Sequence, residues 1–166
     1  MIRRSWFTAL AVAVVSVAGL TAAPAALASP AAQETAPHAL KTTFKGVHPE
    51  LNGLRVKGIN GPEIYLILDG RRHWIPNPAT YNNLFRDWNG IQTIVDPDSI
   101  DNGGQLSDGA FLGKSPNAPE VYLISNGVKR WITSPAAMDK YYFNWNRIKY
   151  VEPVALQAIP QGGNIS

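Results

Sequence analysis

The sequence predicts an α+β fold made of two tandem copies of a hairpin–helix–strand repeat of about 57 residues. The stretch EIYLILDGRRHWIPNP at residues 63–78 recurs as EVYLISNGVKRWITSP at residues 120–135. Each copy places Asp-Gly or Asn-Gly between two runs of β-forming residues, which is typical of a β-hairpin. Aromatic residues at helical spacing follow each hairpin. Because one copy is too small for a core of its own, we expect the two copies to pack about a pseudo-twofold axis.

The repeat extends beyond the hairpins. A shift of 57 residues aligns residues 62–94 with residues 119–151, and 13 of the 33 pairs are identical. GGQLS at residues 103–107 also resembles GGNIS at residues 162–166 after a further shift of two residues. We interpret the identical positions as turn, cap and core residues that maintain the shape of the repeat.

The N-terminus has the features of a secretory signal peptide. Arg3 and Arg4 precede an apolar run at residues 9–20, which is too short to span a bilayer as a helix. An Ala-Leu-Ala cleavage pattern follows, and a retained N-terminal anchor is the alternative. We therefore expect a secreted protein without a membrane span after cleavage. The expected organisation is a signal peptide at 1–28, a flexible N-terminal segment at 29–45, repeat unit 1 at 46–107 and repeat unit 2 at 108–166.

The register of each hairpin follows from its turn. Asp-Gly and Asn-Gly suit a two-residue type I′ turn, in which both residues need a positive φ. Counting outward from the turn places Tyr65 opposite Trp74, and Tyr122 opposite Trp131. A cross-strand aromatic pair of this kind contributes about 0.2–1 kcal/mol relative to an alanine pair.

A short helix is predicted after each hairpin. Asn77 and Ser134 are suitable N-cap residues, and each precedes a proline at the first helical position. Large side chains then recur at i, i+3, i+4 and i+7. They are Tyr81, Leu84, Phe85 and Trp88 in the first copy, and Met138, Tyr141, Tyr142 and Trp145 in the second. The pattern predicts that Trp88 and Trp145 are core residues in the last helical turn, with Asn89-Gly90 ending the first helix.

Further strands complete each unit. IQTIV at residues 91–95 and IKYVE at residues 148–152 are predicted to form a strand after each helix. Short strands are also expected before the hairpins, at residues 54–57 and 110–113. A connector rich in proline, glycine and aspartate follows the first unit's last strand.

Composition excludes several function classes. After removal of residues 1–28 the chain has 13 basic and 12 acidic residues and no block of like charge, so nucleic-acid binding through a general positive field is not expected. The absence of cysteine excludes thiol catalysis and cysteine-ligated metals. No G-x-S-x-G, H-E-x-x-H or phosphate-binding glycine loop is present. A catalytic triad would need His73, which we interpret as a partly exposed strand residue. We predict that the protein is not an enzyme and has no cofactor.

Four aspartates gather in the connector DPDSIDNGGQLSD, namely Asp96, Asp98, Asp101 and Asp108. An oxygen-rich loop can bind Ca²⁺, which takes six to eight oxygen ligands. The connector lacks the 12-residue EF-hand pattern, and the second copy has only Glu152 in this region. A solvated turn is therefore favoured over a metal site.

Aromatic residues are the best candidates for binding. Sugar rings stack on exposed tryptophan and tyrosine faces while neighbouring polar groups bind hydroxyls. The predicted ligand-binding residues are Tyr65, Arg72, Trp74, Tyr122, Lys129 and Trp131. The alternative is that these rings belong to the core. If they are exposed, two copies make the protein bivalent toward a polymer.

The string VYLISNGVKRWITSP resembles a repeat of secreted actinobacterial proteins with the form VYL-x-x-x-G-x-x-RWI-x-x-P. Residues 121–135 match this form, and residues 64–78 match it with His73 in place of the arginine. The resemblance covers most of residues 51–166 and implies a binding or surface role. The combination of YLILDGRRHW with WNGI is also similar to a hemopexin-type repeat, although the closing disulfide of that family is impossible here.

We expect a secreted, non-catalytic protein that binds extracellular or cell-wall glycan. One alternative is a secreted inhibitor or protein-partner-binding module that acts through DPDSIDNGGQ or GKSPNAPE. Another is a structural cell-surface protein. The expected partner is accordingly a polysaccharide or an extracellular protein, with no role for nucleic acid.

Overall fold

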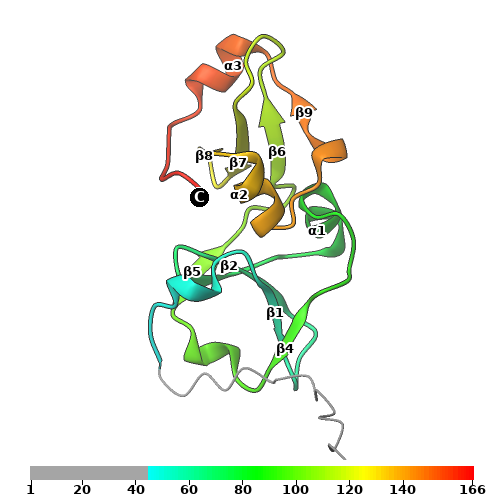
Figure 1. Cartoon of the computed structure of the whole chain (residues 1–166), viewed down its shortest axis with the longest axis vertical. Helices are drawn as coiled ribbons and strands as arrows, with labels where there is room; N and C mark the ends of the chain where they lie inside the picture. Colours follow the sequence, from blue (N-terminus) through cyan, green and yellow to red (C-terminus); the bar gives the residue numbers. More distant parts are fainter. Residues whose placement is uncertain (1–44) are drawn as a thin grey trace, which may run out of the picture. The chain divides into compact units, whose positions relative to one another are not determined.

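The computed structural model describes residues 45–166 and shows a mixed α+β protein. Within these residues nine strands form two sheets, accompanied by three short α-helices (Figure 1). The signal peptide predicted at 1–28, and all but the last residue of the segment predicted as flexible, lie outside the described residues.

The first sheet has the strand order β4-β1-β2-β3-β5. Its central strands β1, β2 and β3 are antiparallel, whereas β4 pairs parallel to β1 and β5 parallel to β3. The bounds are β1 (Arg55–Gly58), β2 (Ile64–Leu68), β3 (Arg71–Trp74), β4 (Gln92–Ile94) and β5 (Asn102–Gln105). β5 lies in the segment that the sequence predicts to be a connector.

The second sheet has the order β8-β7-β6-β9, with β6, β7 and β8 antiparallel and β9 parallel to β6. Beyond β8 the C-terminal segment adds isolated parallel bridges from Lys129 to Gln161 and from Ile132 to Ile165. The bounds are β6 (Phe111–Lys114), β7 (Val121–Ser125), β8 (Val128–Ile132) and β9 (Lys149–Tyr150). The strands predicted before the hairpins are thus confirmed to within one residue.

The helices are short. They are α1 (Pro78–Leu84), α2 (Pro135–Lys140) and α3 (Pro153–Ala158), with 3-10 turns η1 (Pro49–Leu51), η2 (Pro97–Ser99) and η3 (Trp145–Arg147). The predicted N-caps are confirmed, because Asn77 accepts a hydrogen bond from the Thr80 amide and Ser134 accepts one from the Ala137 amide. The sequence does not predict α3.

Both hairpins have the predicted register. Tyr65 lies opposite Trp74, and Tyr122 lies opposite Trp131. The turn residues have positive φ values of 53° and 69° in the first hairpin and 53° and 72° in the second. The type I′ geometry that Asp-Gly and Asn-Gly favour therefore sets both registers. At the tip of the first hairpin, Asp69 forms an ion pair of 2.8 Å with Arg130 of β8.

Both predicted helices end early, and this corrects the prediction that Trp88 and Trp145 are core residues. The residue after α1, Phe85, has the extended backbone angles φ −107° and ψ 157°. Trp88 therefore follows the helix in an irregular segment, and Trp145 opens η3. The two indole side chains are 46% and 45% exposed. Phe85, which belongs to the same predicted stripe, and Phe143 are buried in the core.

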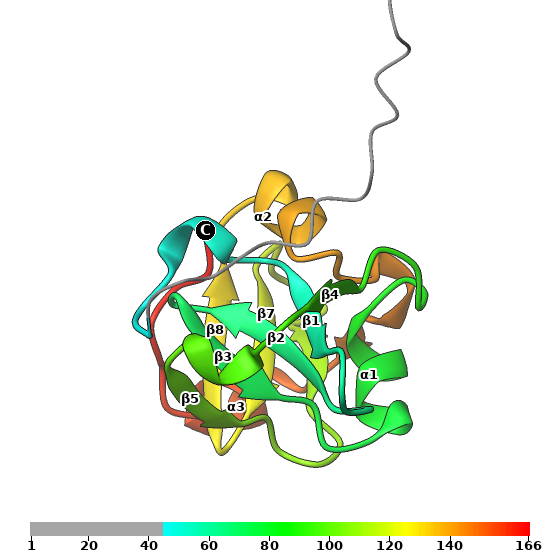
Figure 2. The ribbon, with the colours of Figure 1, turned by 90° about the horizontal axis from the view of Figure 1, so that it is seen from below.

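One hydrophobic core joins the two sheets. It includes buried residues from β2, α1, β6, β7 and α2, and Figure 2 shows β2 and β3 in front of β7 and β8. The segments that follow α1 and α2 meet inside it as an antiparallel pair. Phe85 bridges Phe143, the Arg86 amide donates to the Tyr142 carbonyl at 3.3 Å, and the Asn144 amide donates to the Leu84 carbonyl at 2.8 Å. A smaller core of Val56, Ile67, Ile94 and Ile100 belongs to the first sheet.

Replacement of Gly70 by alanine should destabilise the protein more than the matched replacement of Gly127. Both glycines have positive φ, where an L-residue costs about 1–2 kcal/mol. A Cβ on Gly70 would lie 2.6 Å from Val47 Cγ1 and 2.9 Å from the His48 amide nitrogen, whereas a Cβ on Gly127 would meet nothing within 4 Å. Urea unfolding of the two variants measures the difference in free energy. Equal losses would contradict the close packing of the first turn.

Candidate functional site

Two shallow grooves lie where a hairpin meets the following helix. The first has a volume of about 350 Å³ and the second of about 370 Å³. The first groove is lined by residues 62–64, 74–78, 81 and 88. The second groove is lined by residues 119–121, 131–135, 138 and 145.

Every lining position of one groove has a counterpart 57 residues away in the other. Six of the ten pairs are identical, which is a higher share than the 13 of 33 found over the whole aligned stretch. The identical pairs include both tryptophans, a glutamate and two prolines. The groove residues are therefore more alike between the two aligned stretches than those stretches are as a whole.

Each groove has one tryptophan from a hairpin. Trp74 is at the end of β3 and Trp131 is near the end of β8, and each lies opposite a tyrosine on the neighbouring strand. Their side chains are 37% and 36% exposed. Both rings are thus supported on one side by the protein and open to solvent on the other, as a stacking platform requires.

The second tryptophan of the first groove is fixed from two directions. Trp88 stacks on Tyr81 with ring centroids 4.1 Å apart and an interplanar angle of 22°. Its indole N–H donates to Asn82 Oδ1 at 2.9 Å. A ring that is stacked and hydrogen-bonded in this way has little rotamer freedom left to lose when a ligand binds.

Arg55 holds the backbone on either side of Trp88. Arg55 is 4% exposed, and its guanidinium donates to the carbonyl oxygens of Asp87 at 3.0 Å and Asn89 at 2.7 Å. It also donates to the Tyr81 hydroxyl at 2.5 Å. Arg55 is therefore a positioning residue, because it fixes both the indole's backbone and the ring on which the indole stacks.

Tyr142 closes this cluster from the second half of the chain. Its ring lies 4.0 Å from the Arg55 guanidinium, and its hydroxyl donates to Asp87 Oδ2 at 2.9 Å. The Asn89 amide and the Tyr142 hydroxyl both donate to Asp87, and these bonds lower the pKa of its carboxyl group. Burial raises the pKa of Tyr81. The cluster therefore consists of one cation, one carboxylate and neutral phenols at ordinary pH.

The second groove is built differently beneath its tryptophan. Trp145 begins η3, whose N-cap Asn144 accepts a hydrogen bond from the Asn146 amide at 2.9 Å. Met138 takes the place that Tyr81 has in the first groove. A flexible thioether replaces the stacked phenol there, so the floor of this groove adapts more easily to a ligand.

Polar groups in the grooves are few. Asn77 is engaged by the Thr80 amide and by Asp108, to which its side-chain amide donates at 2.7 Å. Glu63 and Glu120 lie in the two grooves and form no ion pair with any residue between 45 and 166. These carboxylates are the groups available to a ligand.

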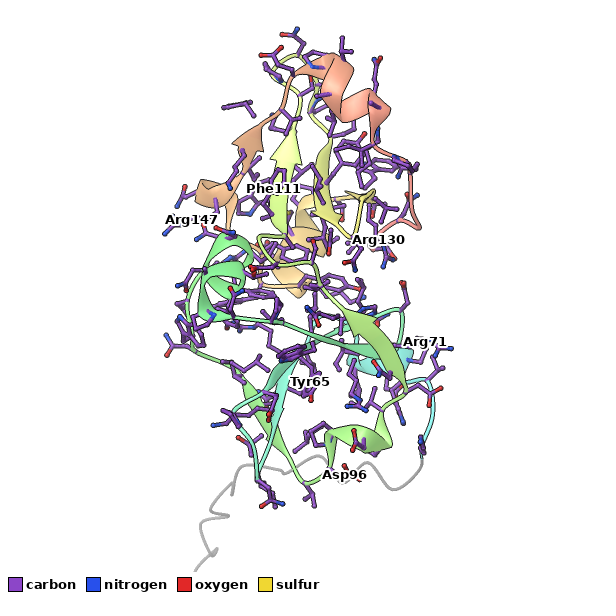
Figure 3. The ribbon with its side chains drawn as sticks, turned by 180° about the vertical axis from the view of Figure 1, so that it is seen from behind. Tyr65, Arg71, Asp96, Phe111, Arg130 and Arg147 are labelled. Atoms are coloured by element: carbon purple, nitrogen blue, oxygen red, sulfur yellow. The ribbon has the colours of Figure 1, made fainter. Side chains whose placement is uncertain are left out.

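The structure separates the predicted site residues. Trp74 and Trp131 line the grooves, but Tyr65 borders a neighbouring hollow of about 260 Å³ with Asp96 (both labelled in Figure 3). Tyr122 borders another hollow of about 370 Å³, which Trp131 and Glu120 also line.

The two predicted cations support the fold. Arg72 forms an ion pair with Asp98, donates to the Ile100 carbonyl at 3.0 Å and lies 5.3 Å from the Tyr65 ring centroid. Lys129 donates through Nζ to the Leu156 carbonyl. Both side chains are therefore engaged within the protein rather than directed into either groove.

The groove residues that sequence reasoning did not predict as ligand-binding include the glutamate and the second tryptophan of each groove, namely Glu63, Trp88, Glu120 and Trp145. The signal that could have identified them is their identity between the two aligned stretches. Identity by itself does not distinguish a core residue from a binding residue, and the helical spacing favoured the core for both tryptophans.

The aspartates of the connector have separate roles. Asp96 caps η2 by accepting from the Asp98 amide, Asp98 and Asp101 pair with arginines of β3, and Asp108 contacts Asn77. Among residues 45–166 no group of three or more metal-ligating side chains is suited to hold an ion. His73 is half-buried with its Nε2 buried and unpartnered, and burial lowers its pKa.

Comparison with known protein families, curated proteins and solved structures finds no match. In the described part of the chain, no helix has the length and apolarity needed to cross a membrane. The function must therefore be inferred from the two grooves themselves.

Replacement of Arg55 by methionine should lower the free energy of unfolding by about 2–4 kcal/mol, because buried oxygens lose a charged donor. The indole of Trp88 should also become more mobile, which fluorescence anisotropy would report. The control is Arg71→Met, since Arg71 is half-exposed and has only a 3.7 Å ion pair with Asp101. The control should change stability by no more than about 0.5 kcal/mol. Similar losses in the two variants would refute the special role of Arg55.

Proposed function

We propose that this chain is a secreted, non-catalytic protein that binds extracellular or cell-wall glycan through the two grooves. The observation that carries the proposal is the pair of matching grooves, each with two exposed tryptophans. Large apolar side chains on a surface cost solubility, and their recurrence at two corresponding places favours a binding role.

The chemistry of the grooves fits a sugar ring. A pyranose presents a flat apolar face that stacks on an indole and a rim of hydroxyls that needs hydrogen-bond partners. The two tryptophans of each groove supply the apolar faces, and a glutamate at the edge supplies acceptors. Because the Trp88 ring is stacked and hydrogen-bonded before binding, it loses little conformational entropy on association.

We further propose that the two halves are copies of one unit, packed about a pseudo-twofold axis. The strand order β4-β1-β2-β3 in the first sheet corresponds to β9-β6-β7-β8 in the second. The contact between residues 84–86 and 142–144 supports the axis, because Phe85 bridges Phe143 while Arg86 bonds to Tyr142. Under the 57-residue shift, Tyr142 corresponds to Phe85 and Phe143 corresponds to Arg86. Phe85 therefore contacts the counterpart of Arg86, and Arg86 contacts the counterpart of Phe85, as a twofold arrangement requires.

Two grooves per chain make the protein bivalent. A polysaccharide long enough to reach both grooves gains affinity from the second site without any additional contact, by about 10²–10⁴-fold when the geometry permits. A polymer in a cell wall or extracellular matrix is therefore a better ligand than a free monosaccharide.

Binding should depend on both tryptophans of a groove. Soluble oligosaccharides and polysaccharides are first screened for binding. Calorimetry with a short oligosaccharide that binds should then give two sites per chain. The variant Trp131→Ala/Trp145→Ala should give one site with unchanged affinity, and its affinity for the polymer should fall by about 100-fold.

The matched control is Tyr150→Ala, since Tyr150 is 71% exposed and lies outside both grooves. It should retain two sites. The absence of binding across the whole panel, or undiminished binding after loss of all four groove tryptophans, would rule out the proposed function.

A further inference from the structure

Each groove has a single charged residue, and in both grooves it is a carboxylate. Of the ten residues that line the first groove, only Glu63 and the Tyr81 phenol are ionisable, and only Glu63 is charged at neutral pH. Of the ten that line the second groove, only Glu120 is ionisable. Both glutamates are at least partly exposed and neither has an ion-pair partner within residues 45–166. The charge of each groove is therefore negative and uncompensated by the protein.

This glutamate is also the one charged residue that is identical between the two aligned stretches. Other charged positions differ, as in the pairs Arg71 with Val128 and Asp87 with Asn144. If a groove only needed a hydrogen-bond acceptor for a hydroxyl, glutamine, asparagine or serine would serve. The retained feature is a negative charge at the edge of two indoles.

Among residues 45–166 no cation forms an ion pair with either glutamate. The hollow that shares Glu63 also contains Asp96 and Asp98, and the hollow that shares Glu120 contains only neutral partners beside it. Lys57 and Lys114 lie on the neighbouring strands, opposite Ile64 and Val121, but neither forms an ion pair with these glutamates. A cationic ligand in either groove therefore meets a carboxylate that no cation of the described residues pairs with.

We propose that both grooves select a sugar with a free, protonated amine, and that Glu63 and Glu120 are the residues that determine this specificity. The inference rests on the glycan-binding function proposed above. An ammonium group on the sugar can interact with an indole face and donate a hydrogen bond to the carboxylate at the same time. A neutral or N-acetylated sugar retains the stacking but loses the charge interaction.

The test compares two ligands of equal length that differ in charge, a tetramer of glucosamine and a tetramer of N-acetylglucosamine. At a pH that protonates the amines, the wild-type chain should bind the glucosamine tetramer about tenfold more tightly in calorimetry. The variant Glu63→Gln/Glu120→Gln keeps the side-chain shape and should bind both tetramers equally. The control Glu152→Gln removes an exposed carboxylate outside the grooves and should keep the preference.

The outcomes are distinct. Equal binding of the two tetramers by the wild-type chain, or a preference that survives in the double variant, overturns the amine specificity and leaves glycan binding intact. If other members of the panel bind but neither tetramer does, the amine specificity is likewise overturned and glycan binding is retained. No glycan binding at all removes the proposed function and this inference with it. Displacement of the glucosamine tetramer by an equal concentration of a tetralysine peptide would assign the grooves to a protein ligand and also overturn the inference.

Discussion

The buried side chain of Arg55 joins the first half of the described chain to the second. It comes from β1, donates to the Tyr81 hydroxyl on α1, holds the backbone on either side of Trp88, and lies against the Tyr142 ring from the second half of the chain. A buried cation is stable only when its donors are satisfied, so these partners must be in place together. Tyr142 even adopts a φ of 57°, which is unfavourable for an aromatic residue and is offset by these contacts.

The grooves are a consequence of how the core is filled. Phe85 and Phe143 leave the helical path to occupy the space between the sheets, and their rings lie 5.8 Å apart. The chain then turns outward, which leaves Trp88 and Trp145 at the surface beside the hairpin tryptophans. The interaction that joins the two halves thus also leaves these tryptophan side chains at the surface.

Local features of the sequence predicted the hairpins well. An Asp-Gly or Asn-Gly turn of two residues determines which residues face each other, and the predicted pairs Tyr65–Trp74 and Tyr122–Trp131 are confirmed. The starts of α1 and α2 were also predictable, because an N-cap side chain and a proline act within one turn of helix. The predicted Trp88 position was wrong because helical spacing continues in the sequence after the helix has ended.

The sequence by itself determined the turns, the helix starts, the strands beside them and the absence of cysteine chemistry, since each depends on residues close together in the chain. Tertiary structure decided where the helices end, which rings are buried, and that Arg72 and Lys129 stabilise the fold while Glu63 and Glu120 line the grooves. These outcomes depend on competition among side chains for one shared core. Periodicity along the chain reports a preferred face for each residue, but it does not report which of several aromatic rings fills the limited space between two sheets.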